Sequence, residues 1–164
     1  MKCVCSTFTT SLTANWLMPE HPFHLAIPVR DIPEARDFYG TRMGLTEGRS
    51  DARWVDYDLY GHQLVVHLDP RLASDSRIQH HFNGVDGQQV PVPHFGVVLG
   101  MNEWCELRDR VSLFVEEFVV EPCIRFAGQP GEQATMFFLD PSGNALEFKG
   151  FADVEQSLFN KGGA

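Results

Sequence analysis

The stretch HLAIPV at residues 24–29 recurs as HFGVVL at residues 94–99, 70 positions further along the chain. Each copy is a short apolar run that begins with a histidine and precedes a helical pattern, which is typical of a buried strand. Residues 57–65 (YDLYGHQLV) and 139–147 (LDPSGNALE) also correspond, because each has an aspartate and, three positions later, a glycine. The sequence therefore predicts two diverged copies of one supersecondary unit.

Both copies carry the signals of the same series of elements. In the first copy we expect a strand over 23–29, a helix that Asp31 caps and Gly44 ends, and strands over 53–59 and 63–68. The second copy repeats this order, with a helix capped by Asn102 and strands over 118–122, 135–139 and 145–148. The first copy thus predicts the order strand, helix, strand, strand, and the second follows the same order with one more strand after its helix.

The length of 164 residues suits a single domain that the two copies divide between them. We expect residues 1–20 to be a disordered extension, with Met18 as the hypothetical natural start, and residues 152–164 to be a peripheral tail. The domain spans residues 21–151. Its parts are a first module over about 22–69, a turn-rich linker over about 70–91 and a second module over about 92–150.

Composition and charge exclude several classes of function. The net charge is −9 and no run of Lys or Arg offers a basic surface, so nucleic acid is not an expected partner. No apolar stretch near the start is long enough for a signal-peptide core or a membrane span, so no membrane association is expected. The cysteines lack paired metal-site spacing and the density of a disulfide scaffold, which predicts reduced thiols and a cytoplasmic protein (Cys3, Cys5, Cys105 and Cys123).

Three side chains with metal-binding chemistry stand at matching points of the repeat. Side chains alternate across a strand, so His24 and His94 have small neighbours, Ala26 and Gly96, on their own faces. If the copies pair about a pseudo-twofold axis, the two imidazoles approach each other and Glu147 can reach the same place. Two histidines and one carboxylate form the facial triad that suits iron(II), with manganese, zinc and nickel as alternatives. In a purely structural interpretation, both imidazoles bond to the backbone and the carboxylate is solvated.

The sequence also resembles a known family over residues 22–150, the vicinal oxygen chelate superfamily of glyoxalase I, fosfomycin and bleomycin resistance proteins and extradiol dioxygenases. His24 and His94 match the histidines that open the family's two modules, and Glu147, within DPSGNALEF, matches its closing carboxylate. The resemblance implies an α+β fold in which two βαβββ modules form a curved mixed sheet around a metal site. It also implies a homodimer. The stretches GHQLVVHL and GEQATMFF are most similar to the small predicted extradiol-type dioxygenases.

One departure from the family pattern narrows the expected chemistry. The counterpart of Glu147 in the first copy is Val65, which cannot bind a metal, whereas glyoxalase I normally uses four ligands. The remaining triad implies an iron(II) dioxygenase that acts on a small, bidentate, catechol-like substrate. Two alternatives stay open: a metal-dependent lyase, isomerase or transferase of the glyoxalase or fosfomycin type, and a non-catalytic protein that binds an aromatic compound as bleomycin-resistance relatives do.

His67 is the candidate catalytic base for such a reaction. It lies two residues beyond Val65 and therefore faces the same side of its strand. The alternative is a polar strand end that bonds to a neighbouring turn. For Arg125 a surface salt bridge is favoured over a substrate contact, and the histidines at 80–81 are expected to be solvated.

Overall fold

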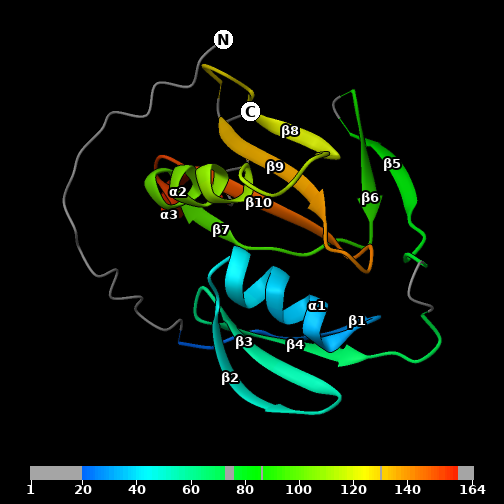
Figure 1. Ribbon diagram of the computed structural model, residues 1–164. Coiled ribbons are helices and arrows are strands. Elements are labelled where there is room, and N and C mark those ends of the chain that lie inside the picture. The colour runs from blue at the N-terminus through cyan, green and yellow to red at the C-terminus, as the bar shows by residue number, and fades with distance from the viewer. Residues whose placement is uncertain (1–19, 73–75, 86, 130, 159–164) are drawn as a thin grey trace.

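The computed structural model describes residues 20–72, 76–85, 87–129 and 131–158. The expected extension over 1–20 thus lies outside the described residues except for Glu20, and residues 152–158 are the described part of the expected tail. Two four-stranded sheets, each with its own helix, and a two-stranded hairpin make up the fold (Figure 1). The expected α+β class is confirmed.

The first module contains a mixed sheet in the order β1-β4-β3-β2, in which β1 runs parallel to β4 and the other neighbours are antiparallel. Helix α1 continues directly into the π-helix η1. The elements are β1 (His24–Val29), α1 (Ile32–Ala35), η1 (Arg36–Arg42), β2 (Thr46–Asp51), β3 (Trp54–Leu59) and β4 (His62–Leu68).

The local signals in the first module act as expected. The Asp31 side chain accepts a hydrogen bond from the Glu34 backbone N–H at 2.7 Å, which caps the helix. Gly44 has φ +78°, the left-handed backbone that favours glycine after a helix. The local patterns did not indicate strand β2, because all six of its residues are exposed and lack apolar alternation, but the βαβββ module that the resemblance implies includes this strand.

The second module repeats this arrangement in the order β7-β10-β9-β8, with β7 parallel to β10. Its helix is capped two residues earlier than expected: the helix starts after Gly100, whose N–H donates to the Glu103 carboxylate at 3.1 Å, and Asn102 lies inside the first turn. The elements are β7 (Val98–Gly100), α2 (Met101–Val111), β8 (Val120–Arg125), β9 (Gln133–Leu139), β10 (Ala145–Phe151) and α3 (Val154–Ser157).

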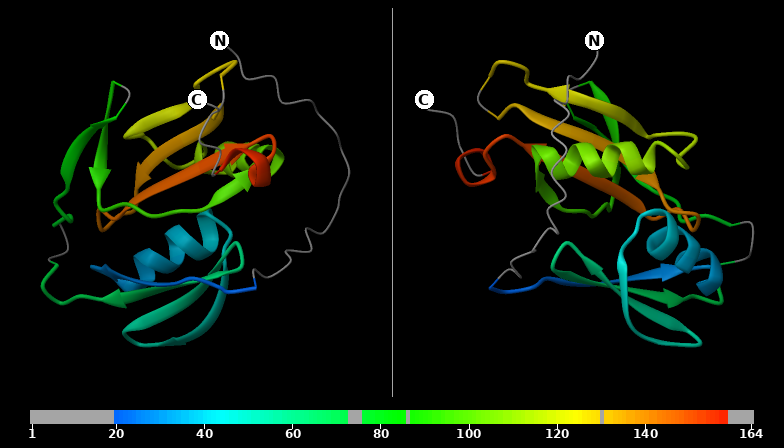
Figure 2. Two further views of the ribbon diagram at one scale, coloured as in Figure 1. Left: turned by 180° about the vertical axis from the view of Figure 1, so that it is seen from behind. Right: turned by 60° about the vertical axis from the view of Figure 1, so that its left-hand side comes forward.

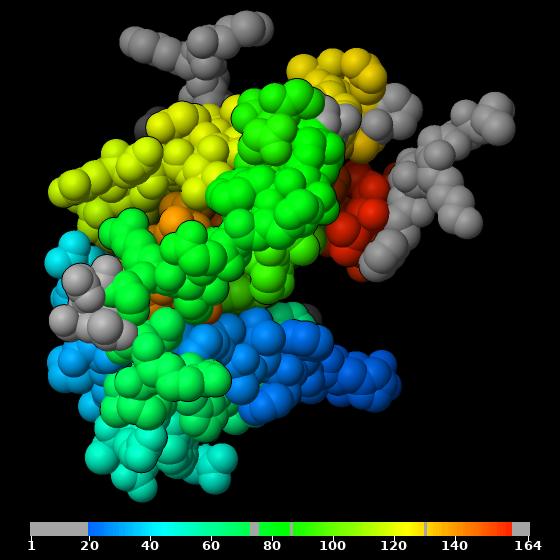
Figure 3. Space-filling model, turned by 90° about the vertical axis from the view of Figure 1, so that its right-hand side faces the viewer, coloured from blue at the N-terminus to red at the C-terminus, as the bar shows by residue number. Residues whose placement is uncertain are grey.

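The segment expected to be a turn-rich linker contains the hairpin of β5 (His81–Val85) and β6 (Gln88–Val92). Val90 packs with Val120 and Phe137 in a small apolar cluster on the second sheet. Figure 3 shows the hairpin in bright green, lying over that sheet. The alternation in β6 is short and interrupted by a proline, so the sequence signal for this hairpin is weak.

Helix α1 and η1 lie between the first sheet and the second module, as Figures 1 and 2 show from three directions. The Phe38 ring is 5.6 Å from that of Phe114 and 6.3 Å from that of Phe138. One hydrophobic core therefore serves both modules. In the described part of the chain the two sheets stay separate and do not join into one curved sheet.

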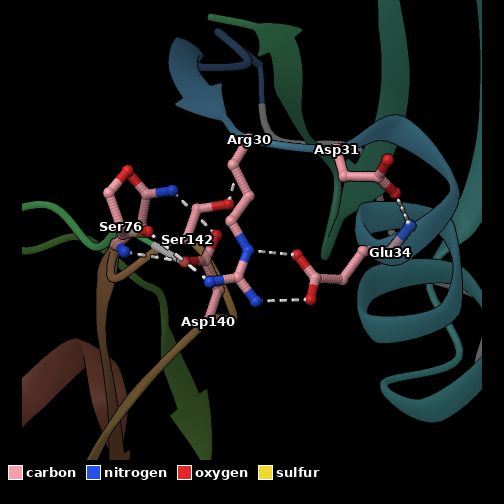
Figure 4. A network of polar contacts seen from close by, with 7 residues as sticks. Arg30, Asp31, Glu34, Ser76, Asp140 and Ser142 are labelled. Carbon is pink, nitrogen blue, oxygen red and sulfur yellow. Dashed lines mark hydrogen bonds and ion pairs between the residues drawn. The ribbon is translucent and has the colours of Figure 1, made fainter. Parts of the chain in front are cut away.

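The loop after β9 ties the modules together at their polar edge (Figure 4). The Arg30 backbone N–H donates to the Ser142 hydroxyl at 3.0 Å, and the Arg30 guanidinium makes two hydrogen bonds with Glu34, at 2.6 and 2.7 Å. The guanidinium also reaches the backbone oxygen of Ser76 at 3.5 Å. The DPSGN motif, residues 140–144, therefore holds the end of β1.

Asp140 is the buried centre of this loop. Its carboxylate accepts hydrogen bonds from the Tyr39 hydroxyl at 2.9 Å, and from the Asn144 backbone and side-chain N–H groups, both at 2.7 Å. Burial raises the pKa of Asp140, and these hydrogen bonds oppose that shift. The Asn144 amide also donates to the backbone oxygen of Pro28 at 2.9 Å, so the loop bonds to both β1 and η1.

Cys3 and Cys5 lie outside the described residues, and of the other two cysteines only Cys105 differs from the expectation of reduced thiols. Cys105 is disulfide-bonded, whereas Cys123 is a free thiol whose pKa is raised by burial.

In the described segments, no helix has both the length and the apolar character needed to cross a bilayer.

Candidate metal centre

His94 and Glu147 meet on the face of the second sheet that the hairpin borders. The His94 Nε2 atom lies 3.3 Å from the Glu147 Oε2 atom, and the Glu147 side chain is 9% exposed. Glu147 comes from the middle of β10, and His94 precedes β7, which is shorter than the expected strand. A Cβ added at Gly96 would lie 1.6 Å from the backbone oxygen of Glu147, so the close pairing of these segments requires glycine there.

The other oxygen of Glu147 is held by neighbours on the same face. Oε1 accepts a hydrogen bond from the buried Thr135 hydroxyl at 3.1 Å, and the Lys149 ammonium lies 3.7 Å away. The Phe137 ring contacts the His94 imidazole edge to face, with centroids 5.1 Å apart. These contacts fix the carboxylate so that Oε2 points toward His94.

The Nδ1 atom of His94 points away from Glu147, and its hydrogen bond determines which ring nitrogen carries the proton. Nδ1 lies 2.6 Å from the Pro91 carbonyl oxygen, which can only accept, so Nδ1 carries a proton. In a neutral imidazole the Nε2 lone pair is then directed at the carboxylate. Two lone pairs at this distance need a cation between them, either a proton or a metal ion. The pair therefore fits a metal that prefers nitrogen and oxygen ligands.

The structure does not bring His24 to this pair. His24 lies at the start of β1 on an exposed face, and its Nδ1 is 2.7 Å from the Gln63 Oε1 atom. Helix α1 and η1 cover the opposite face, where Ile27 and Val29 are buried, so the face with His24 is turned away from the second module. Across the described ranges, no group of three or more His, Cys, Asp or Glu side chains is placed to hold a metal ion.

The strand register supports the equivalence of Val65 and Glu147. In the first sheet Leu25 pairs with Leu64, and in the second Phe95 pairs with Leu146. Val65 and Glu147 each follow directly after these pairs and occupy the same place in their sheets. The first module therefore has an apolar residue where the second has a carboxylate.

His67, the candidate base, is exposed and lies on the same face as His24. It is four residues beyond Gln63 along β4, a separation of about 13 Å. Its role as a base stays a prediction, and it requires a substrate that extends along the strand.

The remaining polar candidates lie away from this pair. The Arg125 guanidinium lies over the Phe126 ring, 5.3 Å from its centroid. His80 is partly buried and bonds to the backbone oxygen of Gly143, which differs from the expected solvation, whereas His81 is exposed.

Sequence reasoning did not identify the residues that orient the two imidazoles. Gln63 lies next to His24 and donates in turn to Asp56, and the Pro91 carbonyl lies next to His94. The polar face of β3 was visible in the alternation of its sequence, but strand alternation does not predict which partner strand brings an amide to an imidazole.

Comparison with known proteins identifies the family. The family model of the Glyoxalase/Bleomycin resistance protein/Dioxygenase superfamily matches residues 21–148. No curated protein matched the sequence.

Several solved structures are similar. A glyoxalase/bleomycin resistance protein/dioxygenase from Alicyclobacillus acidocaldarius has 32% sequence identity and a TM-score of 0.64, and the match covers 83% of this chain and 95% of that one. A glyoxalase/dioxygenase from Nostoc punctiforme has 17% identity and a TM-score of 0.59, with 90% and 100% covered. The fosfomycin resistance protein FosX from Listeria monocytogenes has 15% identity and a TM-score of 0.54, with 85% and 99% covered. The chain thus belongs to the glyoxalase/bleomycin resistance protein/dioxygenase superfamily.

Proposed function

We propose that the protein is a metal-dependent enzyme whose metal ligands are His24, His94 and Glu147. The observation that carries this proposal is the contact of 3.3 Å between His94 Nε2 and Glu147 Oε2, with the His94 Nδ1 proton donated to a backbone carbonyl. Two histidines and a carboxylate are the ligand set of non-haem iron(II) oxygenases, and Val65 supplies no fourth ligand. Iron(II) is therefore the preferred metal, with manganese, zinc and nickel as alternatives.

We infer that the complete site forms between two copies of the chain. In one copy, the face with His24 is turned away from His94 and Glu147, and a shared core fixes the two modules in that arrangement. β1 and β7 are both edge strands, each with one neighbour in its sheet. Between them lies a groove with a volume of about 590 Å³, lined by residues that include Phe23, Leu25 and Val97. A second copy that covers this groove can bring its own His24 to the pair.

The proposed substrate is small and has two adjacent oxygen atoms, as in a catechol. A bound divalent metal would lower the pKa of a substrate hydroxyl and hold the reactants together. Thr135 and Lys149 then keep the Glu147 carboxylate in one orientation, and Phe137 shields the His94 ring from one side. His67 is the proposed acceptor for a substrate proton.

Metal analysis of anaerobically purified protein tests the ligand set. Wild-type protein should hold close to one iron per chain, and Glu147→Gln, which preserves the shape of the side chain, should lower metal affinity by roughly tenfold or more. Glu121→Gln is the matched control, because Glu121 is an exposed carboxylate on β8 of the same sheet. Equal metal content in wild type and Glu147→Gln would contradict the ligand assignment.

Oxygen uptake distinguishes the proposed reaction from its alternatives. Iron-loaded protein should consume oxygen with a catechol among the substrates tested. Turnover without oxygen consumption would instead indicate a lyase, isomerase or transferase. Tight binding of an aromatic compound by protein that takes up no metal would indicate a binding module.

A further inference from the structure

His24 stands at the end of a chain of polar contacts that spans all four strands of the first sheet. Its Nδ1 atom is 2.7 Å from the Gln63 Oε1 atom. The Gln63 Nε2 atom donates to the Asp56 carboxylate at 3.1 Å, and the Arg49 guanidinium lies 3.6 Å from the same carboxylate oxygen. Asp56 is only 8% exposed, although it lies on the face that no helix covers.

The Asp56 carboxylate sets the direction of both hydrogen bonds between it and His24. An ionised carboxylate only accepts, so the amide nitrogen of Gln63 must face Asp56 and the amide oxygen must face His24. That oxygen also only accepts. The Nδ1 atom of His24 therefore donates, and in a neutral imidazole the Nε2 atom keeps its lone pair.

We propose that Gln63 and Asp56 are positioning residues that hold His24 in the Nδ1–H tautomer and leave its Nε2 lone pair for the metal. This inference rests on the proposed function, because it supplies the protonation state that a metal-binding His24 needs. The Pro91 carbonyl imposes the same tautomer on His94 through the main chain. The two modules thus prepare equivalent imidazoles for one metal by different means.

Nitrogen NMR of the metal-free full-length protein tests the tautomer directly. At pH 8 an ordinary imidazole is neutral, so multiple-bond ¹H–¹⁵N correlations distinguish Nδ1–H from Nε2–H. His24 should be Nδ1–H in wild type and should move to the Nε2–H tautomer, or to a mixture, in Gln63→Leu. His94 is the internal control and should stay Nδ1–H in both proteins.

A second variant exchanges the positions of acid and amide. In the double variant Gln63→Glu with Asp56→Asn, the new carboxylate accepts from His24 and the new amide donates to that carboxylate. The wild-type tautomer should return. This variant keeps the polar contacts, so it also tests the inference if Gln63→Leu folds poorly.

Metal titration connects the tautomer to the site. With Zn²⁺ as the probe, Gln63→Leu should bind about 10 to 100 times more weakly than wild type, and the double variant should recover most of that loss. An unchanged His24 tautomer in Gln63→Leu would overturn the inference whether or not the protein binds metal. A changed tautomer with wild-type Zn²⁺ affinity would overturn the link to the metal. Failure of the proposed function would appear separately, as wild-type protein that binds no metal while the tautomer still responds to Gln63→Leu.

Discussion

Each sheet has one face that none of the described helices covers, which we call its open face. An imidazole lies at an equivalent position on both open faces, but its neighbours differ. In the first module, His24 pairs in register with Gln63, whose side chain supplies the hydrogen-bond acceptor for Nδ1. In the second, Ala145 occupies the place of Gln63, and the main chain of Pro91 supplies the acceptor instead. The second module also carries Glu147 where the first has Val65. The repeat has thus diverged into one half with the anionic ligand and one half without it.

The largest effect is expected from a complementation experiment that tests whether the two halves meet between copies. His24→Ala and His94→Ala homodimers should each hold no metal. In a heterodimer of the two variants, one site has lost both histidines and the other has both, so metal should return to half of the wild-type stoichiometry. Differently tagged chains, co-expressed and purified through both tags, allow this measurement by elemental analysis.

The same experiment has an outcome that contradicts the arrangement. If each site formed within one chain, every chain of the heterodimer would lack a ligand. Metal would then be absent from the heterodimer as well. Recovery of metal therefore assigns the site to the contact between copies, and continued absence assigns it to a single chain.

Substitutions at Ala26 and Gly96 compare how each module tolerates a change at the same place. Ala26 lies in β1, and Gly96 stands at the equivalent place before β7. A Cβ at Gly96 would lie 1.6 Å from the Glu147 backbone oxygen, so Gly96→Ala should destabilise the protein by about 3 kcal/mol or more. Ala26→Gly should cost only about 0.5–1 kcal/mol. Urea unfolding of both variants measures the difference, and similar midpoints would show that β10 and the segment before β7 can separate easily.

The repeat itself was predictable from the sequence, because buried strands and capped helices leave strong local patterns. Asp31, Gly44 and the strand that follows His24 all behave as their spacing indicates. Strand β2 left no pattern because it is exposed throughout. An exposed edge strand needs no alternation of apolar side chains to pair with its neighbour, so its sequence does not reveal it.

The arrangement of the two modules was not predictable in the same way. The sequence placed His24, His94 and Glu147 at matching points, but it did not show that η1 would pack Phe38 against the second module and keep the sheets apart. Apolar residues on a helix indicate that a face is buried and not which element buries it. The contact between His94 and Glu147 lies within one module, and local register was sufficient to suggest it.

Alkaline pH should reveal the asymmetry between modules through the three tyrosines, all of which belong to the first module. Burial raises the pKa of Tyr57 and of Tyr60 to about 12 and raises that of Tyr39 well above its ordinary value. The folded state thus binds more protons than the unfolded state between pH 10 and 12. Stability present below pH 10 is therefore lost as the pH rises through 12.

Tyrosinate absorbance and urea midpoints measured over that interval test this prediction. The absorbance change should lag behind that of free tyrosine by about two pH units, and the urea midpoint should fall over the same range. A tyrosine that ionises near pH 10 without loss of stability would show that the first module's helix-covered face admits water.

The smallest effect should come from a pair of matched hydroxyl deletions at the junction. Tyr39 and Tyr57 are both fully buried, with ring centroids 5.7 Å apart, but only Tyr39 bonds across the modules, to Asp140. Tyr39→Phe removes a donor from a buried carboxylate and should cost about 1–3 kcal/mol.

Tyr57→Phe removes a buried hydroxyl for which the described residues offer no partner, so the free energy of unfolding should stay the same or rise by up to about 1 kcal/mol. Because the two substitutions delete the same atom from neighbouring rings, the difference between their unfolding free energies isolates the bond between Tyr39 and Asp140. Equal changes in both variants would mean that the DPSGN loop adds no stability to the junction through this bond. The fixed separation of the two open faces would then rest on the shared apolar core and on the other contacts of the loop.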